Sequence, residues 1–168
     1  HQYYGGVVEV SRGCPFLCEF CDIRILPDNN RSHIKPASII VEEVAHMAKL
    51  GVKQILFACD NFIGNIKWAE EVCDKLIAWK QQTGASVSLY TWLTINVSRN
   101  DVLLKKLRRA GFDMFFIGVE SFNQNSLLET AKAQNTAGEL SDALKHVQSF
   151  GFIVVAGLIF GFDSDPDD

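Results

Sequence analysis

The chain has 168 residues, of which 48% are hydrophobic and 21% charged, and its net charge is −4. This is the composition of a globular protein with one sizeable core, and no apolar run is long enough to cross a bilayer. The negative charge disfavours a nucleic-acid partner, because phosphate binding needs basic surface. Five cysteines without a secretory segment are typical of a reducing compartment, so we predict a cytoplasmic protein.

Strand-like and helix-like segments alternate along the chain. The strand-like segments are short and apolar, and polar or glycine-containing stretches separate them from the helical patterns. We predict five strands, at residues 7–10, 54–58, 87–93, 114–119 and 153–159.

Helical patterns with start and stop signals lie between these strands. Pro36 can open the first helix, because its missing N–H costs nothing at that position, and Asn65 and Asn100 are suited to N-caps. Thr136 and Glu139 form a capping box before the last helix. The four predicted helices end at glycines, which are Gly51, Gly84, Gly111 and Gly151.

This alternation predicts an α/β fold of about five βα units around a parallel sheet. A complete eight-stranded barrel needs about 250 residues. We therefore predict a partial, open TIM-like βα barrel with outer helices. A flavodoxin-like three-layer sheet has similar strand content and is the main alternative.

A short stretch after the first strand carries three thiols, Cys14, Cys18 and Cys21. Gly13 and Pro15 argue against a regular element there, and a loop can point all three sulfurs at one centre. Gathered thiolates favour a soft metal. A closed zinc site needs four ligands, so a zinc site would require a fourth residue such as His33. Three cysteines can instead hold a [4Fe–4S] cluster and leave one iron open.

This stretch resembles the cluster loop of the radical S-adenosyl-L-methionine (radical SAM) superfamily. The family signature is this cysteine spacing with an aromatic residue before the third Cys, here Phe20. The wider stretch 9–23 is similar to the subgroup that usually carries an upstream cobalamin-binding domain. The resemblance implies a six-stranded partial barrel, so we expect 1–168 to be a radical SAM core that lacks the last strand and any cobalamin domain.

Parallel α/β folds bind ligands at the carboxyl ends of their strands. The fourth strand ends at Glu120 and Ser121, and alternation predicts that Glu120, Gly118 and Phe116 face the barrel interior. The resemblance implies that the Gly-x-Glu-Ser position contacts SAM. An ordinary polar strand end is the alternative.

The second strand ends with Cys59, Asp60 and Asn61. The resembled subgroup has two adjacent acids here, and Cys59 replaces the first. Alternation directs Asp60 inward and Cys59 toward the helices, where free Cys acts as a small hydrophobe. We therefore expect Asp60 to meet the ammonium group of SAM, with Asn61 nearby. Cys73 is expected in the core.

The third and fifth strands add weaker candidates. Thr94 and Asn96 alternate with apolar residues and are predicted cofactor contacts, while Trp92 is either a pocket or a core residue. In the fifth strand, glycines on one face allow a flat ring to approach the backbone, as in the adenine-binding strand of the family. The glycines are Gly157 and Gly161, and Ile159 lies between them on the same face. Lys132 also matches the subgroup wording, but most lysines are solvated and it is not selected.

The resemblance implies the following activity. Cys14, Cys18 and Cys21 hold the cluster, whose open iron chelates SAM; reductive cleavage then gives a 5′-deoxyadenosyl radical that abstracts hydrogen from a small-molecule substrate. The subgroup implies methyl transfer or carbon rearrangement with cobalamin in the full enzyme, and an electron donor such as flavodoxin or ferredoxin. A cobalamin-independent radical SAM enzyme and a non-catalytic Cys3His zinc module are the alternatives.

Overall fold

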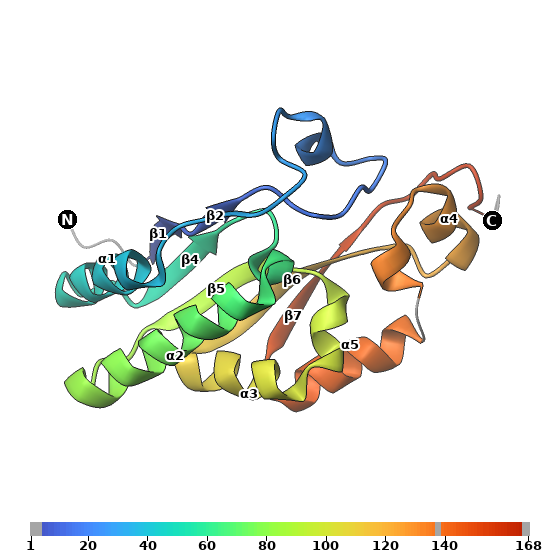
Figure 1. The fold of residues 1–168 in the computed structure, drawn as a ribbon. Coiled ribbons are helices and arrows are strands. Elements are labelled where there is room, and N and C mark those ends of the chain that lie inside the picture. The colour runs from blue at the N-terminus through green and yellow to red at the C-terminus, as the bar shows by residue number, and fades with distance from the viewer. Residues whose placement is uncertain (1–4, 137–138, 166–168) are drawn as a thin grey trace.

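A computed structural model describes residues 5–136 and 139–165 of the chain. Five strands form one parallel sheet whose spatial order follows the chain order (Figure 1). A flavodoxin-like sheet has its first two strands exchanged in that order, so this alternative is wrong. The strands are β1 (Gly5–Glu9), β4 (Gln54–Ala58), β5 (Ser88–Leu93), β6 (Phe112–Glu120) and β7 (Ile153–Leu158).

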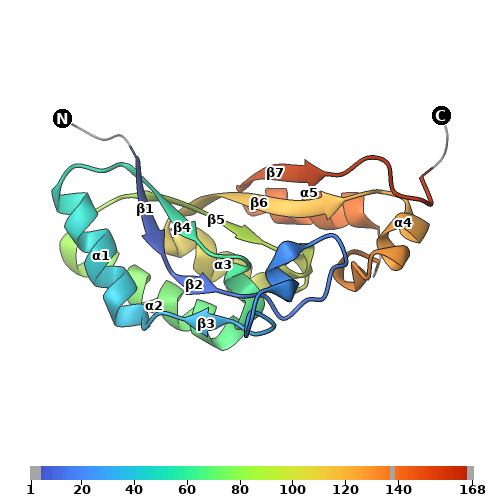
Figure 2. The ribbon, with the colours of Figure 1, turned by 90° about the horizontal axis from the view of Figure 1, so that it is seen from above.

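Four helices connect the successive strands and pack on one face of the sheet (Figures 1 and 2). Right-handed crossovers between neighbouring strands place every helix on the same side. The opposite face is left open, which confirms the predicted partial barrel. The connecting helices are α1 (Ala37–Lys49), α2 (Ile66–Thr83), α3 (Asp101–Ala110) and α5 (Leu140–Ser149). The short elements are α4 (Gln124–Glu129), η1 (Asp22–Ile25), η2 (Phe62–Gly64), η3 (Ile95–Arg99) and η4 (Ala133–Asn135).

Most of the predicted helix signals act as expected. The side chain of Asn65 accepts a hydrogen bond from the backbone N–H of Trp68, at 3.2 Å, and that of Asn100 accepts one from Leu103, at 3.0 Å. The predicted capping box of Thr136 and Glu139 spans residues 137–138, which lie outside the described residues. Glu139 is the N-cap of α5, and it makes no side-chain capping hydrogen bond.

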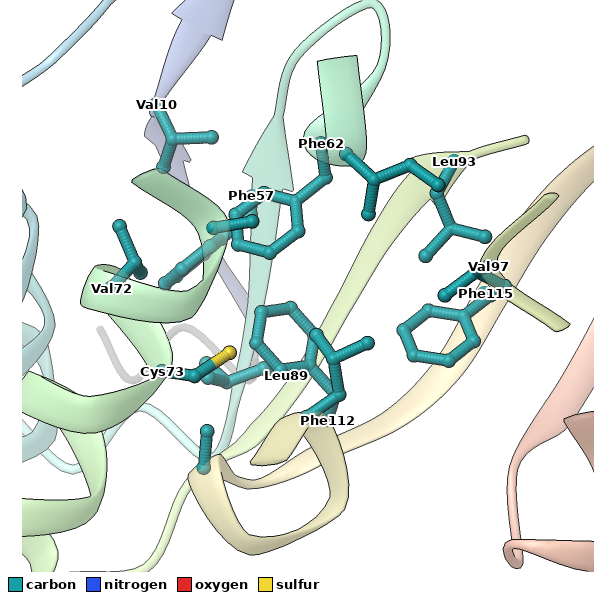
Figure 3. Close-up of a cluster of buried hydrophobic side chains, with 14 of the residues drawn as sticks. Val10, Phe57, Phe62, Val72, Cys73, Leu89, Leu93, Val97, Phe112 and Phe115 are labelled. Atoms are coloured by element: carbon teal, nitrogen blue, oxygen red, sulfur yellow. The ribbon is translucent and has the colours of Figure 1, made fainter. Parts of the chain in front are cut away.

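The core fills the space between the sheet and its helices, and several aromatic rings pack together within it (Figure 3). The rings of Phe57 and Phe112 meet edge to face with centroids 5.4 Å apart. Along β6, Phe115 and Ile117 are fully buried toward the helices, whereas Phe116 is 41% exposed on the other face. This alternation confirms which face of β6 was predicted to line the barrel interior.

A two-stranded antiparallel ribbon stands apart from the main sheet. It pairs β2 (Ser11–Arg12) with β3 (His33–Ile34). These strands are too short to give a periodic sequence signal. The ribbon closes the base of residues 13–32, here called the cysteine loop, which lies over the carboxyl edge of the sheet (Figure 1). Within the described residues, no helix has both the length and the apolarity needed to cross a membrane.

Candidate functional site

Backbone hydrogen bonds tie the cysteine loop to its surroundings. The N–H of Gly13 donates to Oδ2 of Asp60 at 2.6 Å, so the end of β4 holds the start of the loop. Within the loop, the N–H of Cys14 donates to the carbonyl of Asn29 at 3.0 Å. At the far side, the N–H of Glu19 donates to the carbonyl of Thr130 at 2.9 Å. The loop is therefore fixed to the segment that follows α4 as well as to the sheet.

Gly13 occupies a position that only glycine fits. Its φ of +83° is left-handed, and a Cβ atom there would lie 2.1 Å from the carbonyl oxygen of Arg31. The glycine allows the two ends of the loop, at Gly13 and Arg31, to approach each other. This approach places Cys14 beside the sheet.

The loop and the strand ends enclose a pocket of about 190 Å³, here called the cysteine pocket. The structure brings together many of the predicted site residues in its wall. They are Cys14, Cys18, Phe20, Cys21, Asp60, Thr94 and Glu120, joined by Phe16, Ile23, Trp92, Leu93, Phe116, Gly118, Lys132 and Gln134. Trp92 is therefore a pocket residue.

The three sulfurs share this pocket but do not converge on one point. Cys18 is buried, Cys14 and Cys21 are half-buried, and burial raises the pKa of the Cys14 thiol. Among the described residues, no three His, Cys, Asp or Glu side chains are arranged to hold a single metal ion. In a [4Fe–4S] cluster each cysteine binds a different iron, so spaced sulfurs around a cavity fit a cluster.

His33 gives no support to the zinc alternative. It lies in β3, where its Nε2 is 2.6 Å from the carbonyl oxygen of Asp28. It lines a separate hollow with Glu9 and Arg12 and is absent from the wall of the cysteine pocket.

A buried ion pair forms part of the pocket wall. Oε1 of Glu120 lies 2.7 Å from Nζ of Lys132, and their side chains are only 11% and 7% exposed. The Lys132 ammonium also lies 5.5 Å from the centroid of the Phe20 ring, within cation–π range. Sequence reasoning did not select Lys132. Its match to the subgroup wording was the available signal, and the general preference of lysine for solvent outweighed it.

Two side-chain amides contact the cysteine sulfurs. Nε2 of Gln134 lies 3.4 Å from Sγ of Cys18, and Nδ2 of Asn61 lies 3.8 Å from Sγ of Cys14. Asn61 is almost fully buried and also donates to Oγ1 of Thr94 at 3.4 Å. The structure thus places Asn61 behind the cysteine pocket, against a sulfur.

A second hollow of about 500 Å³ adjoins the cysteine pocket, and Glu120 lines both. The ends of β6 and β7 form it. The N–H of Ile159 donates to the carbonyl of Glu120 at 2.8 Å and joins the two strand ends. Three predicted residues, Ser121, Ile159 and Gly161, line this hollow.

Two predicted residues lie differently from the expectation. The third strand ends at Leu93, and the following η3 turns Asn96 back to accept a hydrogen bond from the Thr94 hydroxyl. Gly161 lies beyond β7, in a turn where its N–H donates to Asp165 at 3.0 Å. Gly157 remains in β7, where its backbone lies against the ring of Phe116. Both deviations arise because a turn ends the strand before the alternation reaches the predicted residue.

The remaining cysteines occupy the core side of the sheet, as predicted. Cys73 is fully buried on α2. Sγ of Cys59 lies 3.3 Å from Oγ1 of Thr91, and burial raises the pKa of this thiol to about 12. Neither thiol lines the cysteine pocket.

A parallel sheet whose carboxyl edge carries three thiols, a buried ion pair and a pocket defines a cofactor-dependent α/β enzyme. Residues 8–168 match the family model of the Radical SAM superfamily. The chain belongs to this superfamily, whose members use a [4Fe–4S] cluster and SAM.

The chain is also similar to curated proteins along nearly its whole length. Hopanoid C-2 methylase of Rhodopseudomonas palustris (strain TIE-1) is 33% identical over 168 residues, which cover 99% of this chain and 32% of that protein. The chain spans about a third of the length of the curated relatives it matches.

Two solved structures share the fold. The radical SAM methyltransferase TsrM from Kitasatospora setae, with tryptophan and a SAM analogue bound, has a TM-score of 0.79 at 15% identity, over 98% of this chain and 32% of that one. The cobalamin-dependent SAM radical enzyme OxsB, with aqua-cobalamin and SAM bound, has a TM-score of 0.72 at 20% identity, over 91% and 23%.

Proposed function

We propose that the cysteine pocket binds a [4Fe–4S] cluster through Cys14, Cys18 and Cys21, with SAM beside it. The observation that carries this proposal is that all three thiols share one pocket with Asp60 and Glu120, at the carboxyl edge of the sheet. When bound, the cluster would supply the electron for reductive cleavage of SAM to a 5′-deoxyadenosyl radical. The chain itself positions the sulfurs, orients SAM and limits the access of water.

The amino-acid end of SAM carries an ammonium and a carboxylate, and the pocket offers charges of both signs. Asp60 provides an exposed carboxylate, one oxygen of which is held by the N–H of Gly13. The pair of Glu120 and Lys132 provides a buried carboxylate and ammonium. We assign these three side chains, with Phe20 and Thr94, to SAM binding.

The adjoining hollow is suited to the nucleoside end of SAM. Ser121, Ile159 and Gly161 line it, and Gly157 keeps the neighbouring backbone clear of side-chain bulk. Glu120 lies between the two cavities and can reach a ligand that spans both. In this proposal Asn61 and Asn96 act indirectly, through Cys14 and Thr94 respectively.

In the whole protein we propose methyl transfer to a small-molecule substrate, with cobalamin as the methyl carrier. The methylase relative and the cobalamin-dependent structural neighbour support this. We further propose that residues 1–168 form the radical SAM core of this enzyme. Exposed apolar side chains on β7, including Val155 and Leu158, support an additional strand at that edge. A flavodoxin or ferredoxin in the cytoplasm would supply electrons.

The proposal is tested by anaerobic reconstitution with iron and sulfide, followed by measurement of 5′-deoxyadenosine released from SAM under reducing conditions. Cys18→Ala should abolish release, whereas Cys59→Ala, which removes a thiol outside the pocket, should retain it. If Cys18→Ala still released 5′-deoxyadenosine, the assignment of Cys18 as a cluster ligand would be wrong. Assays of the intact protein with and without cobalamin then separate methyl transfer from cobalamin-independent radical chemistry.

A further inference from the structure

We propose that Gln134 and Asn61 are positioning residues that donate N–H···S hydrogen bonds to the thiolates of Cys18 and Cys14. These bonds would raise the reduction potential of the cluster. The inference rests on the proposed function, because it requires a cluster on these cysteines. It assigns a redox role to two amides that have no charge and offer no nucleophile.

Gln134 is held against Cys18 by the fold of its own segment. Its side chain is buried, and Nε2 lies 3.4 Å from the sulfur. The next residue, Asn135, donates to the carbonyls of Gly118 and Val119, at 3.0 and 2.8 Å, and so fixes the segment to the end of β6. Within the described chain, Oε1 of Gln134 is buried without a partner, and the hydrogen bond that this amide makes is the one from Nε2 to Cys18.

Asn61 approaches a different cysteine from a different element. Its Oδ1 accepts a hydrogen bond from the backbone N–H of Ile63 at 3.3 Å. A backbone N–H can only donate, so this bond determines which end of the amide is oxygen. Nδ2 therefore faces Cys14, with Thr94 as its second partner.

The chemistry of sulfur determines which atom donates and which accepts in these contacts. An iron-bound thiolate has lone pairs and no proton, so it accepts hydrogen bonds and cannot donate them. One-electron reduction makes the cluster one unit more negative, and donors to its sulfurs then gain strength in the poorly hydrated pocket. The amides thus stabilise the reduced state more than the oxidised state. Loss of one donor should lower the equilibrium constant for reduction by up to about tenfold, which corresponds to 59 mV for one electron.

The test is a redox titration of the reconstituted intact protein with dithionite, followed by electron paramagnetic resonance. The only reaction is transfer of one electron from dithionite to the oxidised cluster. Gln134→Leu and Asn61→Leu should each move the midpoint to more negative potential. Gln148→Leu, an exposed site on α5, is the matched control and should leave it unchanged.

Gln134→Glu separates hydrogen bonding from packing. An ionised carboxylate has nearly the same shape, cannot donate, and adds negative charge, so the midpoint should fall at least as far as in Gln134→Leu. The signal arises only from cluster-bearing molecules, so the potential is readable even at low loading. Midpoints equal to the control in the Leu and Glu variants would overturn the inference. A wild-type protein that forms no iron–sulfur chromophore would instead overturn the proposed function.

Discussion

Nζ of Lys132 lies 2.7 Å from Oε1 of Glu120, and both side chains are almost fully withdrawn from solvent. Glu120 also has a left-handed φ of +65°, which is uncommon for a residue with a Cβ. Its carbonyl accepts the N–H of Ile159, so the surrounding backbone fixes this conformation. Strained, buried and charged residues cluster at functional sites, and here they meet beside the cysteines.

Lys132→Met should destabilise the protein strongly. The substitution keeps most of the side-chain length but leaves the Glu120 carboxylate buried without its partner. Breaking a buried ion pair in this way typically costs about 3 to 5 kcal/mol. Denaturant unfolding under anaerobic conditions would measure the loss, and equilibrium binding would show weaker affinity for SAM.

A double variant provides the control for this prediction. Glu120→Gln in the Lys132→Met background removes the unpaired charge, so part of the lost stability should return while SAM binding stays weak. If the two substitutions add with no recovery, the ion pair does not explain the stability of this segment.

Sequence signals between near neighbours predicted most of the sheet and its connecting helices. The bounds of β4 follow directly from residues 54–58, and Asn65 and Asn100 cap their helices as expected, because strand periodicity and capping depend on near neighbours. The inward direction of Glu120 followed from the alternation along β6. These features need no knowledge of distant contacts.

Distant contacts determined the remaining part of the site. The chain reverses after α4 through Ala131, whose φ is +54°, and this turn brings Lys132 and Gln134 back to the cysteines. Nothing in the local sequence indicates where such a turn will dock. Asn96 was misplaced for a related reason, because η3 ends the extended chain that its predicted orientation required.

Gly13→Ala should prevent assembly of the cysteine loop. A Cβ atom at this position would lie 2.1 Å from the Arg31 carbonyl oxygen. The backbone at Arg31 cannot move away without separating the two ends of the loop. Iron and sulfide bound per protein after reconstitution should fall to near the background level. Gly51→Ala is the matched control, since Gly51 has the same φ of +83° but no atom within 4 Å of a new Cβ. It should cost about 1 kcal/mol and leave iron binding intact.

The two thiols outside the pocket should resist alkylation. Burial raises the pKa of Cys59 from 9.0 to about 12 and that of Cys73 well above its ordinary value, so both remain protonated at pH 8. Iodoacetamide reacts with thiolate. Mass spectrometry should therefore find these two cysteines unmodified in the folded protein and modified in urea. Rapid labelling of Cys59 in the folded state would contradict its assigned environment.

The same shift gives a pH dependence of stability. The Cys59 pKa is higher in the folded state than the value of 9.0 expected after unfolding, so the folded state retains its proton more strongly. The associated stability is present below pH 9 and is lost as the pH rises from 9 toward 12. Denaturant unfolding as a function of pH should show a smaller alkaline loss in Cys59→Ala than in the wild-type protein.

Gly157→Ala tests whether the open face of β7 shapes the ligand site. The new Cβ would lie 2.9 Å from Cζ of Phe116. Phe116 is 41% exposed and lines the cysteine pocket, so its ring can move, and the direction away from β7 takes it into that pocket. Stability should change by less than about 1 kcal/mol, because no core contact is lost. The dissociation constant of SAM should rise several-fold in equilibrium binding. Gly5→Ala at the far edge of the sheet, where the nearest atom is 3.7 Å away, should leave that constant unchanged. Equal SAM affinity in the Gly157 and Gly5 variants would mean that the ligand does not approach this part of β7.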